Sequence, residues 1–146
     1  MLLYGADKDV REWVSMQLFG EIDAFSDIDM AIGIVKDNKL IAGVVYNNYV
    51  PNISIEMSIS SIDKCWATRY NLRALFKYPF TQLGLRRVTA LSSANKGDIM
   101  NFLERLGFKQ EGIHREAHYD GGDTVSFGML RNDCGWLSTP KNNRRG

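Results

Sequence analysis

The chain has 146 residues, a net charge of +1, a hydrophobic content of 45% and two cysteines. This is enough apolar material for one substantial core, so neither a repeat array nor a second domain is required. We expect a single domain over residues 1–137, followed by a flexible basic tail over residues 138–146.

No apolar run reaches membrane-spanning length, and the first seven residues lack the basic and apolar regions of a secretory leader. We therefore expect a cytoplasmic protein with no membrane partner. Cys65 and Cys134 lie far apart without a second ligand pair, so they form neither a zinc signature nor a disulfide framework. Free thiols are the simplest interpretation of both residues.

The charges are unevenly distributed along the chain. Up to Met30, seven acidic residues face two basic ones, whereas ten basic residues face four acidic ones between Lys64 and His118. Such a split suits a polyanionic cofactor that meets a cationic amine, and an ordinary dipolar surface of solvated charges is the alternative. The basic half could also contact nucleic acid, but it contains no recognisable nucleic-acid-binding module, so that partner is disfavoured.

The first half of the chain predicts a helix and three strands. Asp7 to Leu18 has apolar residues at helical spacing behind an acidic start, and the acidic, broken segment that follows predicts a loop. Met30 to Lys36 and Leu40 to Tyr49 are apolar runs around a turn sequence, which predicts a hairpin. Ile53 to Ser60 alternates strictly, with isoleucines and Met on one face and Glu56 with serines on the other.

The second half predicts two helices and three strands. Cys65 to Tyr78 is expected to be a helix that Pro79 bends or ends. Leu85 to Ser92 predicts a strand. The strands Phe108 to Tyr119 and Thr124 to Leu130 are joined by Asp-Gly-Gly-Asp, a strong turn signal.

A helix is also expected between Asn95 and Gly107, because its apolar residues form one helical face: Ile99, Phe102, Leu103 and Leu106. Asn95 can cap its start and Gly107 its end. The resulting order of elements, α, ββ, β, α, β, α, ββ, indicates an α+β fold with a mixed sheet.

Two stretches of this region resemble the acyl-CoA-binding half of the GNAT N-acyltransferases: Gln82 to Asn95 and Phe102 to Gly112. Within that superfamily, Phe80 to Val88 and Leu106 to Arg115 resemble the ribosomal-protein N-terminal acetyltransferase branch. The endings Gly128-Met-Leu-Arg131 and Cys134-Gly-Trp-Leu137 resemble uncharacterised bacterial and phage members.

This resemblance implies the GNAT fold, a central, mixed and mostly antiparallel sheet that is splayed at the cofactor cleft and flanked by helices. It also implies acetyl transfer from acetyl-CoA to a primary amine, such as a protein N-terminus, a lysine or a small amine. Related enzymes often pair through edge strands, so a homodimer is a possible partner arrangement. A GNAT-like scaffold that has lost its chemistry and acts as a binding protein is the alternative.

The pyrophosphate loop is the largest departure from the family. The family pattern is Q/R-x-x-G-x-G/A, whose glycines let backbone N–H groups approach phosphates, but Asp63 to Asn71 contains no glycine. The resemblance still implies cofactor contacts in this segment and near it, involving Trp66, Ala67, Thr68, Arg69, Tyr70, Asn71, the backbone of Ser58 and Ile59, and the side chain of Asn95. The alternative for the loop is an ordinary helix start with a packed Trp and a surface Arg.

Amine acetylation requires a base, because an ammonium group has no lone pair with which to attack a thioester. Glu56 is the sole carboxylate on the polar face of its strand, and some GNAT enzymes use this type of position; a structural carboxylate is the alternative. The Tyr that many members carry before Gly-Phe is Leu103 in this chain. Tyr119 is therefore the candidate acid, with His118 and His114 as nearby alternatives.

Overall fold

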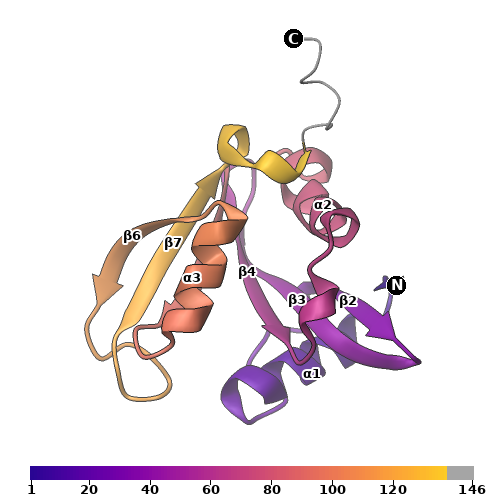
Figure 1. Cartoon of the computed structure of the whole chain (residues 1–146), viewed down its shortest axis with the longest axis horizontal. Helices are drawn as coiled ribbons and strands as arrows, with labels where there is room; N and C mark the ends of the chain where they lie inside the picture. Colours follow the sequence, from indigo (N-terminus) through magenta and orange to yellow (C-terminus); the bar gives the residue numbers. More distant parts are fainter. Residues whose placement is uncertain (138–146) are drawn as a thin grey trace.

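The computed structural model describes residues 1–137, and the predicted tail over residues 138–146 lies outside the described residues. In the described part, one seven-stranded sheet has the order β1-β2-β3-β4-β5-β7-β6 (Figure 1). The strands are β1 Leu2–Leu3, β2 Met30–Lys36, β3 Lys39–Val50, β4 Ser54–Ser61, β5 Arg87–Ser93, β6 Lys109–His114 and β7 Thr124–Leu130. Only β4 and β5 pair in parallel there, so the predicted α+β class with a mixed, mostly antiparallel sheet is confirmed.

Three α-helices flank this sheet in the described residues: α1 Asp7–Phe19, α2 Arg69–Lys77 and α3 Gly97–Leu106. Helix α1 covers one face of β2 and β3, where Val10 and Val14 pack against Ala31 and Val45. Helices α2 and α3 lie on the opposite face, over the larger apolar cluster. None of the helices described is both long and apolar enough to cross a bilayer.

The close approach of α1 to the sheet depends on a pair of glycines. Gly33 on β2 and Gly43 on β3 are cross-strand partners beneath the helix. A Cβ atom at Gly43 would lie 2.7 Å from a methyl carbon of Val14, nearer than two carbon atoms can normally approach. Because Gly33 and Gly43 carry no side chains, α1 can pack closely against β2 and β3. The polar hollow of the candidate site lies on the same face of the sheet as α1.

Strands β4 and β5 part after a short pairing. They share the pairs Ser54–Arg87, Ile55–Val88 and Glu56–Thr89. Beyond these pairs, β3 stays paired to β4 as far as Ser61, and β7 stays paired to β5 as far as Ser93. The sheet therefore opens into two halves, which diverge toward the end of the molecule occupied by α1 (Figure 1). The splay expected from the family resemblance is present.

The helix predicted from Cys65 to Tyr78 is broken. A 3₁₀ turn, η1 Lys64–Trp66, comes first, and α2 begins only at Arg69. Between them, Thr68 has extended backbone dihedral angles and its hydroxyl accepts a hydrogen bond from the Asn71 amide, 3.1 Å away. After Lys77 the chain continues as the π-helical turn η2 Tyr78–Gln82 around Pro79. A good N-cap in the middle of the segment therefore overrode the helical periodicity.

Two further predictions for the second half are wrong. Asn95 does not cap α3, because residue 96 is the N-cap and has no side-chain bond. The backbone N–H of Asn95 donates to Ser93 Oγ at 3.0 Å, and its side chain bonds Asp120. Strand β6 ends at His114 rather than Tyr119. The intervening loop is held by its own hydrogen bonds, including Glu116 N to Asp123 Oδ1 at 2.9 Å. Side chains that satisfy local amides thus replaced strand pairing there.

Candidate active site

Two hollows lie on opposite faces of the sheet where β4 and β5 part. The alternation of β4 places Met57 and Ile59 on the α2–α3 face and Glu56 and Ser58 on the α1 face. On the first face, an apolar slot of about 150 Å³ is lined mainly by Met57, Ile59, Trp66, Phe102 and Leu103. On the second face, a hollow of about 400 Å³ is lined by Phe19, Phe25, Asp29, Asn47, Asn48, Glu56, Ser58 and Tyr119, among others.

The backbone of β4 also presents polar groups to the gap. Ile53 O accepts hydrogen bonds from the β5 side, whereas Ile62 N donates to Ile41 O on the β3 side. Because successive residues of a strand direct their N–H and C=O groups to opposite neighbours, Met57 and Ile59 direct theirs toward β5. The Glu56–Thr89 pair still uses the Met57 N–H, so the Met57 carbonyl and both backbone groups of Ile59 face the gap. The same alternation directs the Ser58 backbone toward β3.

Glu56 is the last residue of β4 that pairs with β5, so it lies at the vertex of the opening. Asn48 Nδ2 donates to its Oε1 at 3.0 Å, and Ser58 Oγ lies 3.5 Å from its Oε2. Burial raises the pKa of Glu56, and these two hydrogen bonds oppose the rise. No basic side chain in residues 1–137 forms a salt bridge with it. Glu56 is therefore a partly buried carboxylate whose basicity exceeds that of a free one.

The asparagines beside Glu56 were not anticipated from the sequence. The register of β3 against β4 shifts between Asn47 and Val50, and Asn48 has a φ of 53° in this bulge. Its side chain thereby reaches Glu56, while Asn47 Nδ2 donates to Ser58 Oγ at 3.0 Å. Two consecutive asparagines in an apolar strand were the available signal, because Asn tolerates the left-handed conformation that a bulge often needs.

Tyr119 lines the same hollow as Glu56, so the structure brings the two predicted catalytic residues together. Its hydroxyl donates to Glu21 Oε2 at 2.8 Å, and its ring packs edge-on against Phe19 with centroids 5.2 Å apart. The hydrogen bond to Glu21 raises the pKa of Tyr119. The contact joins the loop before β7 to the loop after α1, across the mouth of the hollow.

The two histidines bond elsewhere. His118 Nδ1 lies 3.2 Å from Asp120 Oδ1, and His114 Nε2 lies 3.4 Å from Ser126 Oγ. Neither is among the residues that line the hollow around Glu56. Ser93 Oγ donates to Asp120 Oδ2 at 2.5 Å, which ties the loop that carries Tyr119 to the end of β5. This bond, with further contributions from the Gly122 amide, His118 and Asn95, lowers the pKa of Asp120 to about 2.

The backbone amides of the glycine-free loop are largely used within the loop itself. The Asp63 carboxylate accepts from Cys65 N at 2.9 Å. The next amides donate within the same turn: Trp66 N to Asp63 O, Ala67 N to Lys64 O and Thr68 N to Trp66 O. Asn71, which is buried, donates from Nδ2 to Trp66 O at 2.8 Å and so braces the turn from below. This conformation differs from one in which free amides converge on a ligand.

The residues predicted to hold the cofactor are dispersed around this loop. Trp66 is buried against Phe102 with ring centroids 5.8 Å apart, and it lines the apolar slot together with Ile59. Arg69 stacks over the Trp136 ring at 5.7 Å. Tyr70 is exposed and lines a separate hollow beside α2 with Arg73 and Lys77. Asn95 lies beside the loop before β7, next to Gly122.

Acetyl-CoA fits this surface in part. The narrow apolar slot, with backbone polar groups along one edge, has the character that a thioester and its pantetheine arm require. It shares Ser61, Trp66, Ile99 and Phe102 with a more polar hollow of about 550 Å³, whose further lining includes Asp63, Lys64, Ala67, Asp98 and Arg105. Basic side chains are present for a diphosphate there, while the loop amides are engaged.

No protein-family model matches the sequence, and neither does any curated protein. Solved structures do match. A mutant of the spermidine N-acetyltransferase of Vibrio cholerae aligns with a TM-score of 0.73 and 17% identity, over 100% of this chain and 99% of that one. A GCN5-related N-acetyltransferase from Brucella melitensis aligns with a TM-score of 0.65 and 23% identity, over 84% of this chain and 66% of that one.

The ribosomal-protein-S5-alanine acetyltransferase of Vibrio fischeri aligns with a TM-score of 0.61 and 20% identity, over 74% of this chain and 64% of that one. The matched region thus spans about two thirds or less of the Brucella and Vibrio fischeri proteins. With its sheet opened between β4 and β5 and these structural likenesses, the chain has the fold of the GNAT N-acetyltransferases.

Proposed function

We propose that this protein transfers an acetyl group from acetyl-CoA to a primary amine, with Glu56 as the general base. One observation carries the proposal: Glu56 stands at the vertex of the opened sheet, with an apolar slot on one face and a polar hollow on the other. The slot suits a thioester and the hollow suits an amine, so the two reactants would meet through the gap.

The side chains around Glu56 suit proton removal. An amine reaches the site as an ammonium ion, and a partly buried carboxylate with a raised pKa accepts a proton more readily than an exposed one. Asn48 and Ser58 hold the carboxylate in place. When bound, acetyl-CoA supplies the acetyl group as a thioester. The backbone N–H group of Ile59 faces the gap, where it can donate to an oxygen that gains negative charge.

The residues around the slot would hold the cofactor in two ways, by lining its site or by stabilising the neighbouring turn. Ile59, Trp66 and Ala67 line the slot and the hollow that adjoins it. Thr68 and Asn71 keep the turn between η1 and α2 in shape. Four other predicted residues could contact the cofactor only after moving away from the partners or surfaces described above: Ser58, Arg69, Tyr70 and Asn95.

Tyr119 contributes to acceptor binding more readily than to proton donation. Its hydroxyl proton is directed at Glu21, and its raised pKa makes it a weaker acid than a thiol, whose ordinary pKa is about 8.5. As an aromatic wall beside Glu56, it can instead pack against the acceptor. The acidic groups Glu21, Asp29 and Glu56 around this hollow favour a cationic acceptor.

The proposal is tested by ligand-dependent melting together with a transfer assay. Acetyl-CoA at saturating concentration should raise the melting temperature, because a ligand that binds only the folded state stabilises it. Release of free CoA thiol should then depend on an added amine. Spermidine and an alanine-initiated peptide are suitable first acceptors, because structural neighbours are named for acting on such groups. No melting shift and no thiol release with any amine would contradict the proposal.

A binding scaffold without chemistry is the second candidate. The observation that favours it is the engaged loop, where the Asp63 carboxylate already holds the Cys65 amide. The same two measurements separate the candidates, since a scaffold would bind no acetyl-CoA, or would bind it without transferring its acetyl group to any amine and releasing the CoA thiol.

A further inference from the structure

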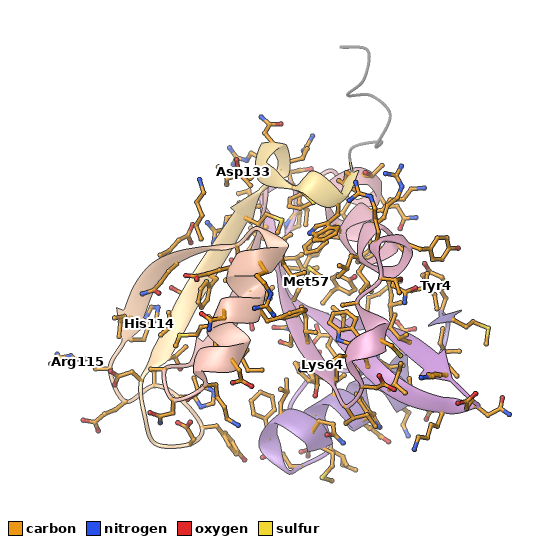
Figure 2. The ribbon with its side chains drawn as sticks, viewed as in Figure 1. Tyr4, Met57, Lys64, His114, Arg115 and Asp133 are labelled. Carbon is orange, nitrogen blue, oxygen red and sulfur yellow. The ribbon has the colours of Figure 1, made fainter. Side chains whose placement is uncertain are left out.

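The hollow beside α2 lies on the flank of that helix that faces β1 and β2. Its volume is about 720 Å³, more than that of each of the other three hollows, and within the range of about 300–1,000 Å³ typical of small-molecule sites. It shares no lining residue with the slot or with the polar hollow that adjoins the slot. Tyr4, which lines it, lies toward the β1 edge of the sheet, whereas Met57 of the slot lies nearer α3 (Figure 2). A ligand bound here would therefore be distinct from the cofactor.

The uncharged lining of this hollow is apolar on one side and aromatic on the other. The apolar side chains come from β1 and β2: Leu2, Met30 and Ile32. Three tyrosines come from the loop after β1, the start of α2 and η2: Tyr4, Tyr70 and Tyr78. Among the tyrosines of residues 1–137, Tyr46 and Tyr119 are those whose hydroxyl groups form hydrogen bonds, so the three hydroxyl groups here are available to a ligand. Aromatic surfaces beside apolar ones favour a ligand with a planar ring.

The charged side chains that line the hollow are both cationic. Arg73 and Lys77 are four residues apart on α2, so they lie on one face of the helix. Arg73 Nη1 donates to Leu137 O at 2.9 Å, which positions the guanidinium group and leaves its other nitrogens for a ligand. Lys77 forms no salt bridge within the part of the chain that the structure describes. No carboxylate of residues 1–137 lines this hollow, so its charge favours an anion.

We propose that this hollow binds a planar aromatic ligand that carries an anionic group, either a phosphate or a carboxylate. The ring would pack against the tyrosines and the apolar residues of β1 and β2, and the anion would bind Arg73 and Lys77 through charge-assisted hydrogen bonds. This site does not depend on the proposed function, because it is separate from the slot and from Glu56. A molecule with both parts should bind more tightly than either part alone.

Isothermal titration of the full chain with AMP, adenosine and ribose 5-phosphate tests this site. AMP carries a ring and a phosphate, whereas the other two each lack one of them, so AMP should bind about tenfold more tightly than either. Indole-3-acetate presents a carboxylate on an aromatic ring, and the tighter of these two aromatic anions identifies the anionic group. Each titration is repeated with saturating CoA, because CoA contains the same nucleotide and would compete for AMP at a shared site.

Lys77→Ala and Tyr70→Ala should each weaken binding of the tighter aromatic anion about tenfold, because each removes one contact with the ligand. Arg115→Ala is the matched control, since it removes an exposed cation on the opposite side of the molecule from Tyr4 (Figure 2). It should leave this affinity unchanged.

Three results of the titrations would overturn the proposed site: failure of both aromatic anions to bind, binding that CoA abolishes, or an equal loss of affinity in Arg115→Ala. Sedimentation that shows a dimer which Tyr70→Ala dissociates would also overturn it, because a second copy of the chain would then fill the hollow. The proposed function is judged separately, by binding of acetyl-CoA and amine-dependent release of thiol.

Discussion

Glu56 shows how a single residue acquires its reactivity from its neighbours. The strand places it on the polar face, the bulge in β3 brings Asn48 onto its Oε1, and the surrounding hollow partly removes it from water. Removal from water favours the neutral acid, while the hydrogen bonds favour the carboxylate, and the first effect dominates. The balance suits a group that must alternate between the two forms.

Replacing Glu56 by Gln should lower kcat/KM for amine acetylation by about 10²- to 10⁴-fold, because the isosteric amide cannot accept the proton. The wild-type profile of kcat/KM against pH should show an acid limb whose pKa lies above 4.5, since burial raises it. Glu104→Gln, on the exposed face of α3, is the matched control and should retain full activity. A Glu56→Gln variant of normal activity would exclude this base.

The same residue should also affect stability. The folded pKa of Glu56 is raised above 4.5, so the folded state holds its proton more tightly than the unfolded state. The contribution of Glu56 to the free energy of unfolding should therefore fall as the pH rises from about 4.5 through the folded pKa. Glu56→Gln lacks this loss, so its melting temperature should exceed that of the wild type at neutral pH, with the difference vanishing below pH 4.5. A constant difference across the pH series would contradict this.

Tyr119→Phe distinguishes the two roles of that residue. The ring contact with Phe19 is retained and the hydrogen bond to Glu21 is lost. If Tyr119 serves only as a wall of the acceptor hollow, the retained ring keeps that wall and the lost bond loosens the loop that carries it, so we expect KM for the amine to rise several-fold with kcat nearly unchanged. A fall in kcat of about 10² or more would instead assign the hydroxyl a catalytic proton. Steady-state kinetics with a varied amine make the measurement.

Among the elements, α1 packs most closely against the sheet, so this contact tolerates added side-chain volume least. Gly43→Ala should destabilise the protein by about 1–3 kcal/mol, because the added methyl group meets Val14, and β-branched residues in a helix have little rotamer freedom with which to yield. Gly97→Ala is the control, because its added Cβ meets nothing within 4 Å at the start of α3. That change should stabilise by about 0.4–1 kcal/mol. Denaturant unfolding of the two variants should therefore show shifts of opposite sign.

Some element boundaries could be predicted from the sequence and others could not. The end of α3 at Gly107 was predictable because its φ of 115° suits glycine, and local backbone chemistry decides it. The break between η1 and α2 was not, because apolar spacing favours one continuous helix and the Thr68 cap outweighs it. The early end of β6 likewise depends on side chains that satisfy the amides of the following loop.

On the scale of the whole molecule, the opening of the sheet has a direct consequence for amide exchange. The Ile59 amide faces the gap, whereas Ile55 lies where β4 still pairs with β5. We therefore expect Ile59 to exchange its amide hydrogen faster than Ile55 does, and to slow on addition of acetyl-CoA. Hydrogen exchange followed by NMR makes this comparison. Equal protection of the two amides without ligand would show that the gap is closed in solution.

The periodicities of the sequence were sufficient by themselves to determine the α+β class, the order of the main elements and the polar face that carries Glu56, because such spacing acts over a few residues. Only the tertiary structure decided where β4 leaves β5, that Asn48 holds Glu56, and that Tyr119 reaches Glu21. Those contacts join segments that are distant in the chain. Strand register and loop packing determine them, so no short-range sequence pattern predicts them.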